Sequence, residues 1–125
     1  MRKLSGLFGA LSLTIGIVSC GGGDTTTPLT CSANTFCLES TSFFPTTLSV
    51  QAGTTVTWQN NVTPPFFHNV IWDDAAGRTA AGAGDGTGDI ADATTTHTRK
   101  FTTAGTFGFH CNVHPGMNAT LTVTP

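Results

Sequence analysis

Short alternating segments, separated by turn residues, constrain the fold of this chain more than any other feature of its sequence. Hydroxyl-bearing residues alternate with apolar ones in segments 47–50, 55–58 and 120–124, so each segment can bury one side and expose the other. No stretch of useful length shows the 3.6-residue period of a helix. About seven or eight such strands, with turns at regular intervals and no helix, predict an all-β protein with a Greek-key β-sandwich fold.

The middle of the chain gives weaker signals. Segment 73–93 is rich in Gly and Ala and holds five of the seven acidic residues, so we expect a long solvated loop, with at most a short strand or turn inside it. Segment 94–101 returns to strand composition, but its alternate positions Thr95, His97 and Arg99 are all polar. That pattern predicts an edge strand.

The densest group of possible metal ligands follows an aromatic strand near the C-terminus. Phe107, Phe109 and Cys111 share one face of this strand, and His114 and Met117 follow at equal spacings of three. Thiolate and thioether sulfur suit Cu(I) and imidazole suits Cu(II), so the combination favours copper. One more imidazole would complete a site of two histidines, one cysteine and a weak axial methionine.

His68 is the candidate for the missing imidazole. Two prolines precede segment 66–72, which we expect to be a strand. With a period of two, His68 shares a buried face with Phe66, Val70 and Trp72. Taken alone, such a histidine is more often a hydrogen-bonded structural residue than a ligand.

The motifs resemble those of the cupredoxins, the small blue-copper fold of plastocyanin, amicyanin and azurin, over essentially all of residues 37–125. The matching segments are 66–70, 105–107 and above all 111–117, whose Cys-x₂-His-x₂-Met spacing is similar to the short ligand loop of amicyanin. The alternative is a sandwich without metal, in which the cysteine is a buried thiol, the second histidine a surface residue and the methionine core filler.

The resemblance implies a role for each matching residue. His68, Cys111 and His114 would be equatorial ligands of one copper ion, and Met117 the long axial ligand. Asn69 would hydrogen-bond to the ligand loop and hold the two halves of the site in register.

The same resemblance implies a function and a docking surface. We expect an electron carrier rather than an enzyme, a monomer that passes single electrons between exported redox proteins such as cytochromes or oxidases. Copper storage or delivery in the cell envelope is the alternative. Partners would dock on a small apolar patch around the edge of His114, with Phe67, Pro65 and Pro115 as members.

The N-terminal residues have the pattern of an export signal. Two basic residues precede an apolar run from Leu4 to Val18, which is short for a permanent membrane span. The run ends at Ser19 and Cys20, followed by three glycines, and resembles a bacterial lipoprotein signal. We expect removal of residues 1–19 and lipidation of Cys20; an ordinary signal peptide cleaved nearby is the alternative. Either way the protein would be exported, to the periplasm or the cell surface, with the lipid as its membrane anchor.

Residues 20–36 would then connect the lipid to a folded domain spanning 37–125. Segment 21–30 has almost nothing to bury and is expected to be a flexible tether. After cleavage, three basic residues remain against seven acidic ones, a formal charge of −4. This balance argues against nucleic acid as a partner and mildly favours cationic ones.

Two of the four cysteines are left without a role by these assignments. With Cys20 assigned to lipid and Cys111 to metal, Cys31 and Cys37 remain, and an exported protein is expected to join them as a disulfide. A second metal or redox site is the alternative, but no histidine lies near them in the sequence.

Overall fold

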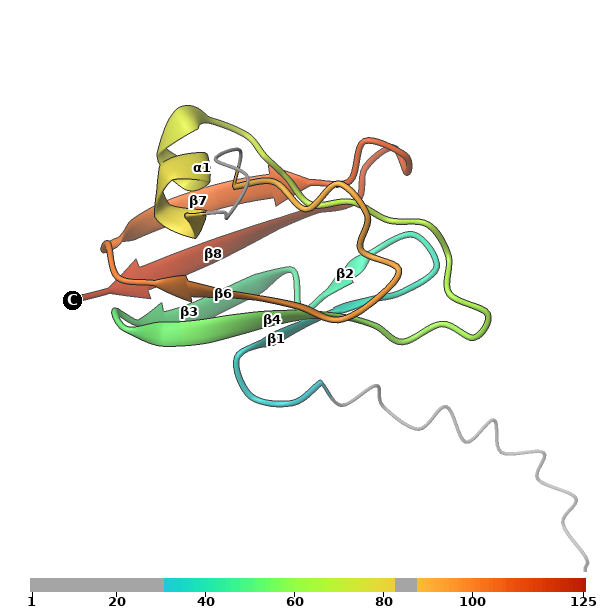
Figure 1. The fold of residues 1–125 in the computed structure, drawn as a ribbon, viewed down its shortest axis with the longest axis horizontal. Coiled ribbons are helices and arrows are strands. Elements are labelled where there is room, and N and C mark those ends of the chain that lie inside the picture. Colours follow the sequence, from blue (N-terminus) through green and yellow to red (C-terminus); the bar gives the residue numbers. More distant parts are fainter. Residues whose placement is uncertain (1–30, 83–87) are drawn as a thin grey trace, which may run out of the picture.

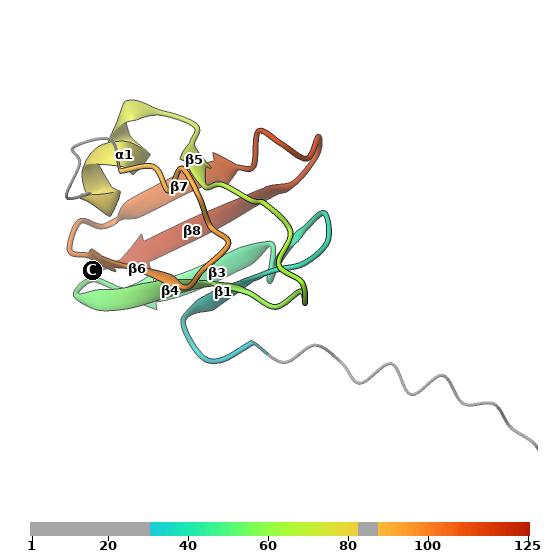
Figure 2. The same ribbon diagram turned by 45° about the vertical axis from the view of Figure 1, so that its right-hand side comes forward.

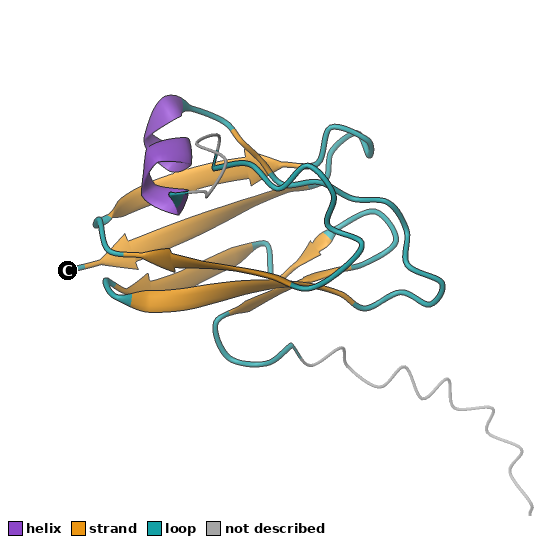
Figure 3. Cartoon of the chain, in the orientation of Figure 1, coloured by secondary structure: helices purple, strands orange, loops and turns teal. Residues whose placement is uncertain are grey.

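The fold is a β-sandwich, as the alternating segments predict. The computed structural model describes residues 31–82 and 88–125, so the predicted signal peptide and Cys20 lie outside the described residues. Within these ranges, eight strands form two sheets of four (Figures 1 and 3). One sheet has the order β2-β1-β4-β6 and the other β3-β8-β7-β5. The strands are β1 (Thr35–Leu38), β2 (Phe43–Phe44), β3 (Thr47–Gln51), β4 (Thr54–Asn60), β5 (Ile71–Trp72), β6 (His97–Phe101), β7 (Gly105–His110) and β8 (Asn118–Thr124).

Strand alternation accounts for the burial pattern. In β8, Ala119, Leu121 and Val123 are buried, and the threonines between them are partly exposed. Strand β8 pairs antiparallel with β7 and parallel with β3, and β1 pairs parallel with β4. Strand β6 lies at the edge of its sheet, in agreement with its polar alternate positions.

Aromatic side chains fill the space between the sheets. Phe109 of β7 lies at their centre, with ring centroids 4.9 Å from Phe36, 5.0 Å from Phe43, 5.8 Å from Trp58 and 5.1 Å from Trp72. All five side chains are at most 1% exposed. Because Phe109 precedes Cys111 by two residues, this packing fixes the end of the strand that leads to the predicted ligand loop.

A short helix replaces part of the expected loop, so the prediction of no helix is wrong. Helix α1 (Ala75–Ala81) lies outside the sandwich (Figure 2). Asp74 caps its start by accepting a hydrogen bond from the Gly77 amide at 2.8 Å, and Gly82 ends it in the left-handed conformation, with φ of 49°. Arg78 connects the helix to β5, because its guanidinium group donates a hydrogen bond to the Trp72 main-chain carbonyl at 2.9 Å.

The strand expected over 66–72 is also shorter than predicted. Residues 61–69 belong to no strand, Val70 forms an isolated bridge with Ile90, and β5 begins only at Ile71. Phe66 is 47% exposed, so its predicted place on the buried face is wrong, whereas His68, Val70 and Trp72 are all buried. The period-two pattern fails at Phe66 because this part of the chain is a loop.

The connections that carry the predicted ligands meet at one end of the sandwich. Segments 39–42, 61–69 and 111–117 lie at this end, and α1 and the C-terminus lie at the other (Figure 1).

Cys31 and Cys37 are joined by a disulfide, with their Cα atoms 5.9 Å apart. No helix of the described residues is long and apolar enough to cross a membrane.

Candidate metal centre

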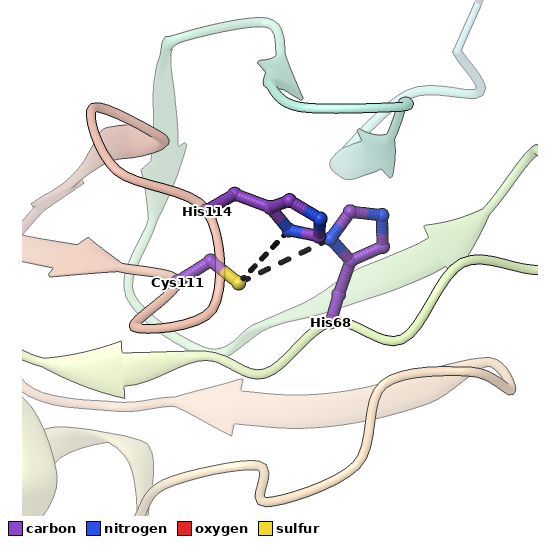
Figure 4. Close-up of side chains that lie close together, drawn as sticks. All are labelled: His68, Cys111 and His114. Atoms are coloured by element: carbon purple, nitrogen blue, oxygen red, sulfur yellow. Dashed lines mark hydrogen bonds between the residues drawn. The ribbon is translucent and has the colours of Figure 1, made fainter.

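Three of the four predicted ligands come together at this end of the sandwich. Single donor atoms of His68, Cys111 and His114 all lie within 4.8 Å of one another (Figure 4). The Cys111 Sγ atom is 3.6 Å from His114 Nδ1 and 4.0 Å from His68 Nδ1. Both imidazoles therefore turn the same ring nitrogen toward the sulfur.

The loop after β7 carries Cys111, His114 and Met117. Its ends are tied by main-chain hydrogen bonds, from the Cys111 amide to the Met117 carbonyl at 2.9 Å and from the Met117 amide to the His114 carbonyl at 3.1 Å. Gly116 has a positive φ of 82° and so permits the turn between His114 and Met117. Residues with a side chain rarely adopt this main-chain conformation. Met117 is 1% exposed and Cys111 is 3% exposed, so the loop turns both sulfur-bearing side chains inward.

His68 comes from a different part of the chain, 43 residues before Cys111. Its side chain is fully buried, and its carbonyl accepts a hydrogen bond from the Ala93 amide at 2.7 Å. The His68 Nε2 atom is buried without a hydrogen bond of ordinary geometry, although the main chain of Glu39 lies close enough to favour the protonated ring slightly. This Nε2 atom is not the ring nitrogen that faces the Cys111 sulfur, which is Nδ1.

Burial lowers the pKa of His68, and the proximity of His114 lowers it further. The main chain of Glu39 opposes this shift only in part. The ring of His68 is therefore neutral at neutral pH, which is the form that binds metals.

The donor set and its spacing fit copper. Protein sulfur and nitrogen ligands lie about 2.0–2.3 Å from a small metal ion, so two ligands of one ion stand about 3.3–4 Å apart. The separations from Cys111 to the two imidazoles fall in this range. Cys111 is also the free thiol of the described residues, which leaves it available as a thiolate.

Asn112, which the sequence analysis did not single out, is the partner of Asn69. The Asn69 side-chain Nδ2 atom donates a hydrogen bond to Asn112 Oδ1. The Asn69 Oδ1 atom accepts a hydrogen bond from the Asn112 main-chain N–H at 2.9 Å. Because Asn69 follows His68 and Asn112 follows Cys111, the pair joins the two parts of the site. The available sequence signal was the presence of a second asparagine directly beside a predicted ligand.

Several apolar side chains that lie close to His68 and His114 in the sequence are exposed to solvent. Phe66 and Phe67 are each 47% exposed and Val113 is 45% exposed, and Pro65 and Pro115 are exposed as well. We call these five residues the apolar rim. Phe66 and Val113 were not among the exposed apolar residues that the sequence analysis named.

Comparison with known proteins identifies the family. Residues 32–124 match the family described as "Copper binding proteins, plastocyanin/azurin family". The chain is 38% identical over 85 residues to plastocyanin of Scenedesmus fuscus, covering 65% of this chain and 85% of that protein. It is 31% identical over 87 residues to plastocyanin of Ulva prolifera, covering 68% and 87%. The chain therefore belongs to the plastocyanin/azurin family of copper-binding proteins, and its cofactor is copper.

Solved structures agree on the fold. An oxidised proline-to-alanine mutant of amicyanin is 27% identical, with a TM-score of 0.53 over 73% of this chain and 81% of amicyanin. A copper-containing nitrite reductase from Thermus scotoductus has a TM-score of 0.59 at 21% identity, but this chain covers only 23% of it. The likeness to the reductase shows the fold alone.

Proposed function

We propose that this protein is a type 1 blue copper protein that carries single electrons between exported redox partners. His68, Cys111, His114 and Met117 would hold the copper ion. The observation that carries the proposal is the convergence of two imidazoles and one free thiol within 4.8 Å in a chain of the copper-binding family.

The residues of the site suit reversible one-electron transfer. Bound copper supplies the Cu(II)/Cu(I) couple. Three features of the chain hold the predicted ligands in place. Main-chain hydrogen bonds close the ligand loop, His68 is buried, and the Asn69–Asn112 pair joins the two segments. Ligands held in place change little between the two oxidation states, and a small rearrangement lowers the barrier to transfer.

Electrons would enter and leave through the exposed part of His114. The apolar rim offers exposed apolar side chains near His68 and His114 in the sequence, suited to close but weak contact with a cytochrome or an oxidase. Lipidation at Cys20 would keep the protein at the membrane where such partners work. That residue lies outside the described residues, so export and anchoring stay predictions from the sequence.

Optical absorption and electron spin resonance of the copper-loaded domain test the function. The wild-type protein should show an intense visible thiolate-to-copper band, which Cys111→Ser should abolish. His97→Ala is the matched control, because His97 lies in β6, outside the ligand group. Absence of the band from the wild type, or its survival in Cys111→Ser, would overturn the proposal.

Copper storage or delivery is the competing function, and copper exchange separates the two. A carrier should keep its copper for hours against a competing chelator, whereas a delivery protein should release it within minutes. Burial of the site supports retention, since three of its four sulfur and nitrogen side chains are at most 3% exposed. The activity of the nitrite reductase is not assigned to this chain.

A further inference from the structure

We propose that Asn60 is a positioning residue of the copper site, because its side-chain amide holds the two main-chain segments that support His68. The proposal rests on the proposed role of His68 as a ligand. It adds a residue that lies outside the ligand loop and whose side-chain hydrogen bonds go to main-chain groups of the described residues.

Asn60 is the last residue of β4, at the point where the chain leaves the sheet. Its Nδ2 atom donates to the Phe66 carbonyl at 2.8 Å and to the Ala93 carbonyl at 3.3 Å. Its Oδ1 atom accepts from the Val62 amide at 3.2 Å. One side chain thus uses both N–H donors and its oxygen on three main-chain groups.

These groups lie on both sides of His68. Phe66 precedes it by two residues, and the Ala93 amide donates to the His68 carbonyl at 2.7 Å. Ala93 is fully buried, so its segment is anchored in the core. Asn60 therefore connects the end of β4, the approach to His68 and the segment that holds the His68 carbonyl.

The need for such a connection follows from the loop conformation around His68. Residues 61–69 belong to no strand, and residues 62–67 form no main-chain hydrogen bond to the other described residues. Side-chain hydrogen bonds to loop main chain are the usual substitute, and Asn60 supplies them here. A loop held at only one end would let His68 shift relative to Cys111.

The same hydrogen bonds orient part of the apolar rim. The Phe66 carbonyl is held by Asn60, while the side chains of Phe66 and the following Phe67 are exposed to solvent. Asn60 thus sets the position of a ligand and of the neighbouring docking residues at once.

Two variants of Asn60 and one neighbouring control test the proposal. Asn60→Ala removes all three hydrogen bonds. Asn60→Asp keeps the shape and the acceptor for Val62 but turns a carboxylate oxygen toward two carbonyls. Asn61→Ala is the matched control, because the exposed Asn61 side chain makes no hydrogen bond to the described residues. Copper affinity by chelator competition and amide hydrogen exchange of the copper-free protein are measured for each.

We expect both Asn60 variants to bind copper about 10–100-fold more weakly, the usual effect of removing a group that orients a ligand. Their spin-resonance parameters should change as well, and the Ala93 amide should exchange at least about tenfold faster. Asn61→Ala should match the wild type in all three. If Asn60→Ala does not fold, the isosteric Asn60→Asp decides alone.

The outcomes separate this proposal from the proposed function. Copper affinity and spin resonance that are unchanged in the Asn60 variants, or changed equally in Asn61→Ala, would overturn the role of Asn60. A wild-type protein without a blue copper signal would overturn the function instead. In that case an unchanged Ala93 exchange rate in the copper-free variants would still contradict the positioning role.

Discussion

Asn69 and Asn112 bind each other through two hydrogen bonds that connect segments 43 residues apart. The Asn69 side chain donates one hydrogen bond to the Asn112 side chain. It accepts the other from the Asn112 main-chain N–H, at 2.9 Å. Asn69 is only 6% exposed, so water cannot readily take the place of Asn112 as its partner. The pair therefore couples the position of His68 to that of Cys111.

A double-mutant cycle on this pair should show strong coupling. Asn69→Ala and Asn112→Ala should each destabilise the copper-free protein by about 1–3 kcal/mol, the first because it removes both hydrogen bonds and the second because it leaves the buried Asn69 Nδ2 without its acceptor. The double variant should be less destabilised than the sum by about 1 kcal/mol or more. Urea unfolding measures all four proteins, and additive effects within about 0.5 kcal/mol would contradict the coupling.

The sequence predicted the ligand group better than the groups that support it. Cys111, His114 and Met117 lie within seven residues, so their spacing carries information about their geometry. Ala93, a partner of Asn60, and Asn112, the partner of Asn69, lie elsewhere in the chain, and only the folded arrangement brings them near. Local patterns report neighbours along a strand, not hydrogen bonds between loops.

The secondary structure, too, was predicted correctly in some parts of the chain and not in others. Alternation was sufficient for β3, β4, β7 and β8, where one face is buried and the other is exposed. It failed for α1, because seven residues rich in Gly and Ala show too little periodicity to indicate a helix. The available signals were its ends, Asp74 as the N-terminal cap and Gly82 at the C-terminus.

Phe109→Ala should be among the most destabilising single changes in the core. The variant removes a ring that packs against four other aromatic rings, and we expect a loss of about 3–5 kcal/mol in the free energy of unfolding. Phe44→Ala is the control, since Phe44 is 45% exposed and should cost less than about 1 kcal/mol. Similar losses for the two variants in urea unfolding would show that the assignment of the core is wrong.

Two glycines with positive φ should respond differently to alanine. At Gly53, with φ of 94°, a Cβ atom would meet nothing within 4 Å, so Gly53→Ala carries backbone strain alone, about 1–2 kcal/mol. At Gly88, with φ of 71°, a Cβ atom would collide with the Arg78 main chain. Gly88→Ala should therefore cost about 1–3 kcal/mol more. Thermal or urea unfolding compares the two, and equal losses would contradict the close contact between Gly88 and α1.

The buried His68 should make the copper-free protein less stable as the pH falls below neutrality. Burial lowers the pKa of His68 in the folded state, whereas in the unfolded chain the ring titrates near its ordinary value of about 6.5. Below that pH the unfolded chain takes up a proton that the folded protein resists. The stabilising contribution is therefore complete above about pH 6.5 and decreases on acidification, by at most about 1.4 kcal/mol per pH unit.

Urea unfolding of the copper-free protein at pH 7.5, 6.5 and 5.5 tests this dependence. His68→Gln, which cannot titrate, should reduce the loss of stability between pH 6.5 and 5.5. His97→Gln should retain it, because His97 lies in β6 away from the ligand group. Since copper needs the neutral ring, the copper-loaded protein should also release its metal more readily at pH 5.5 than at pH 7.5. An equal loss of stability in His68→Gln and the wild type would show that another group causes the acid sensitivity.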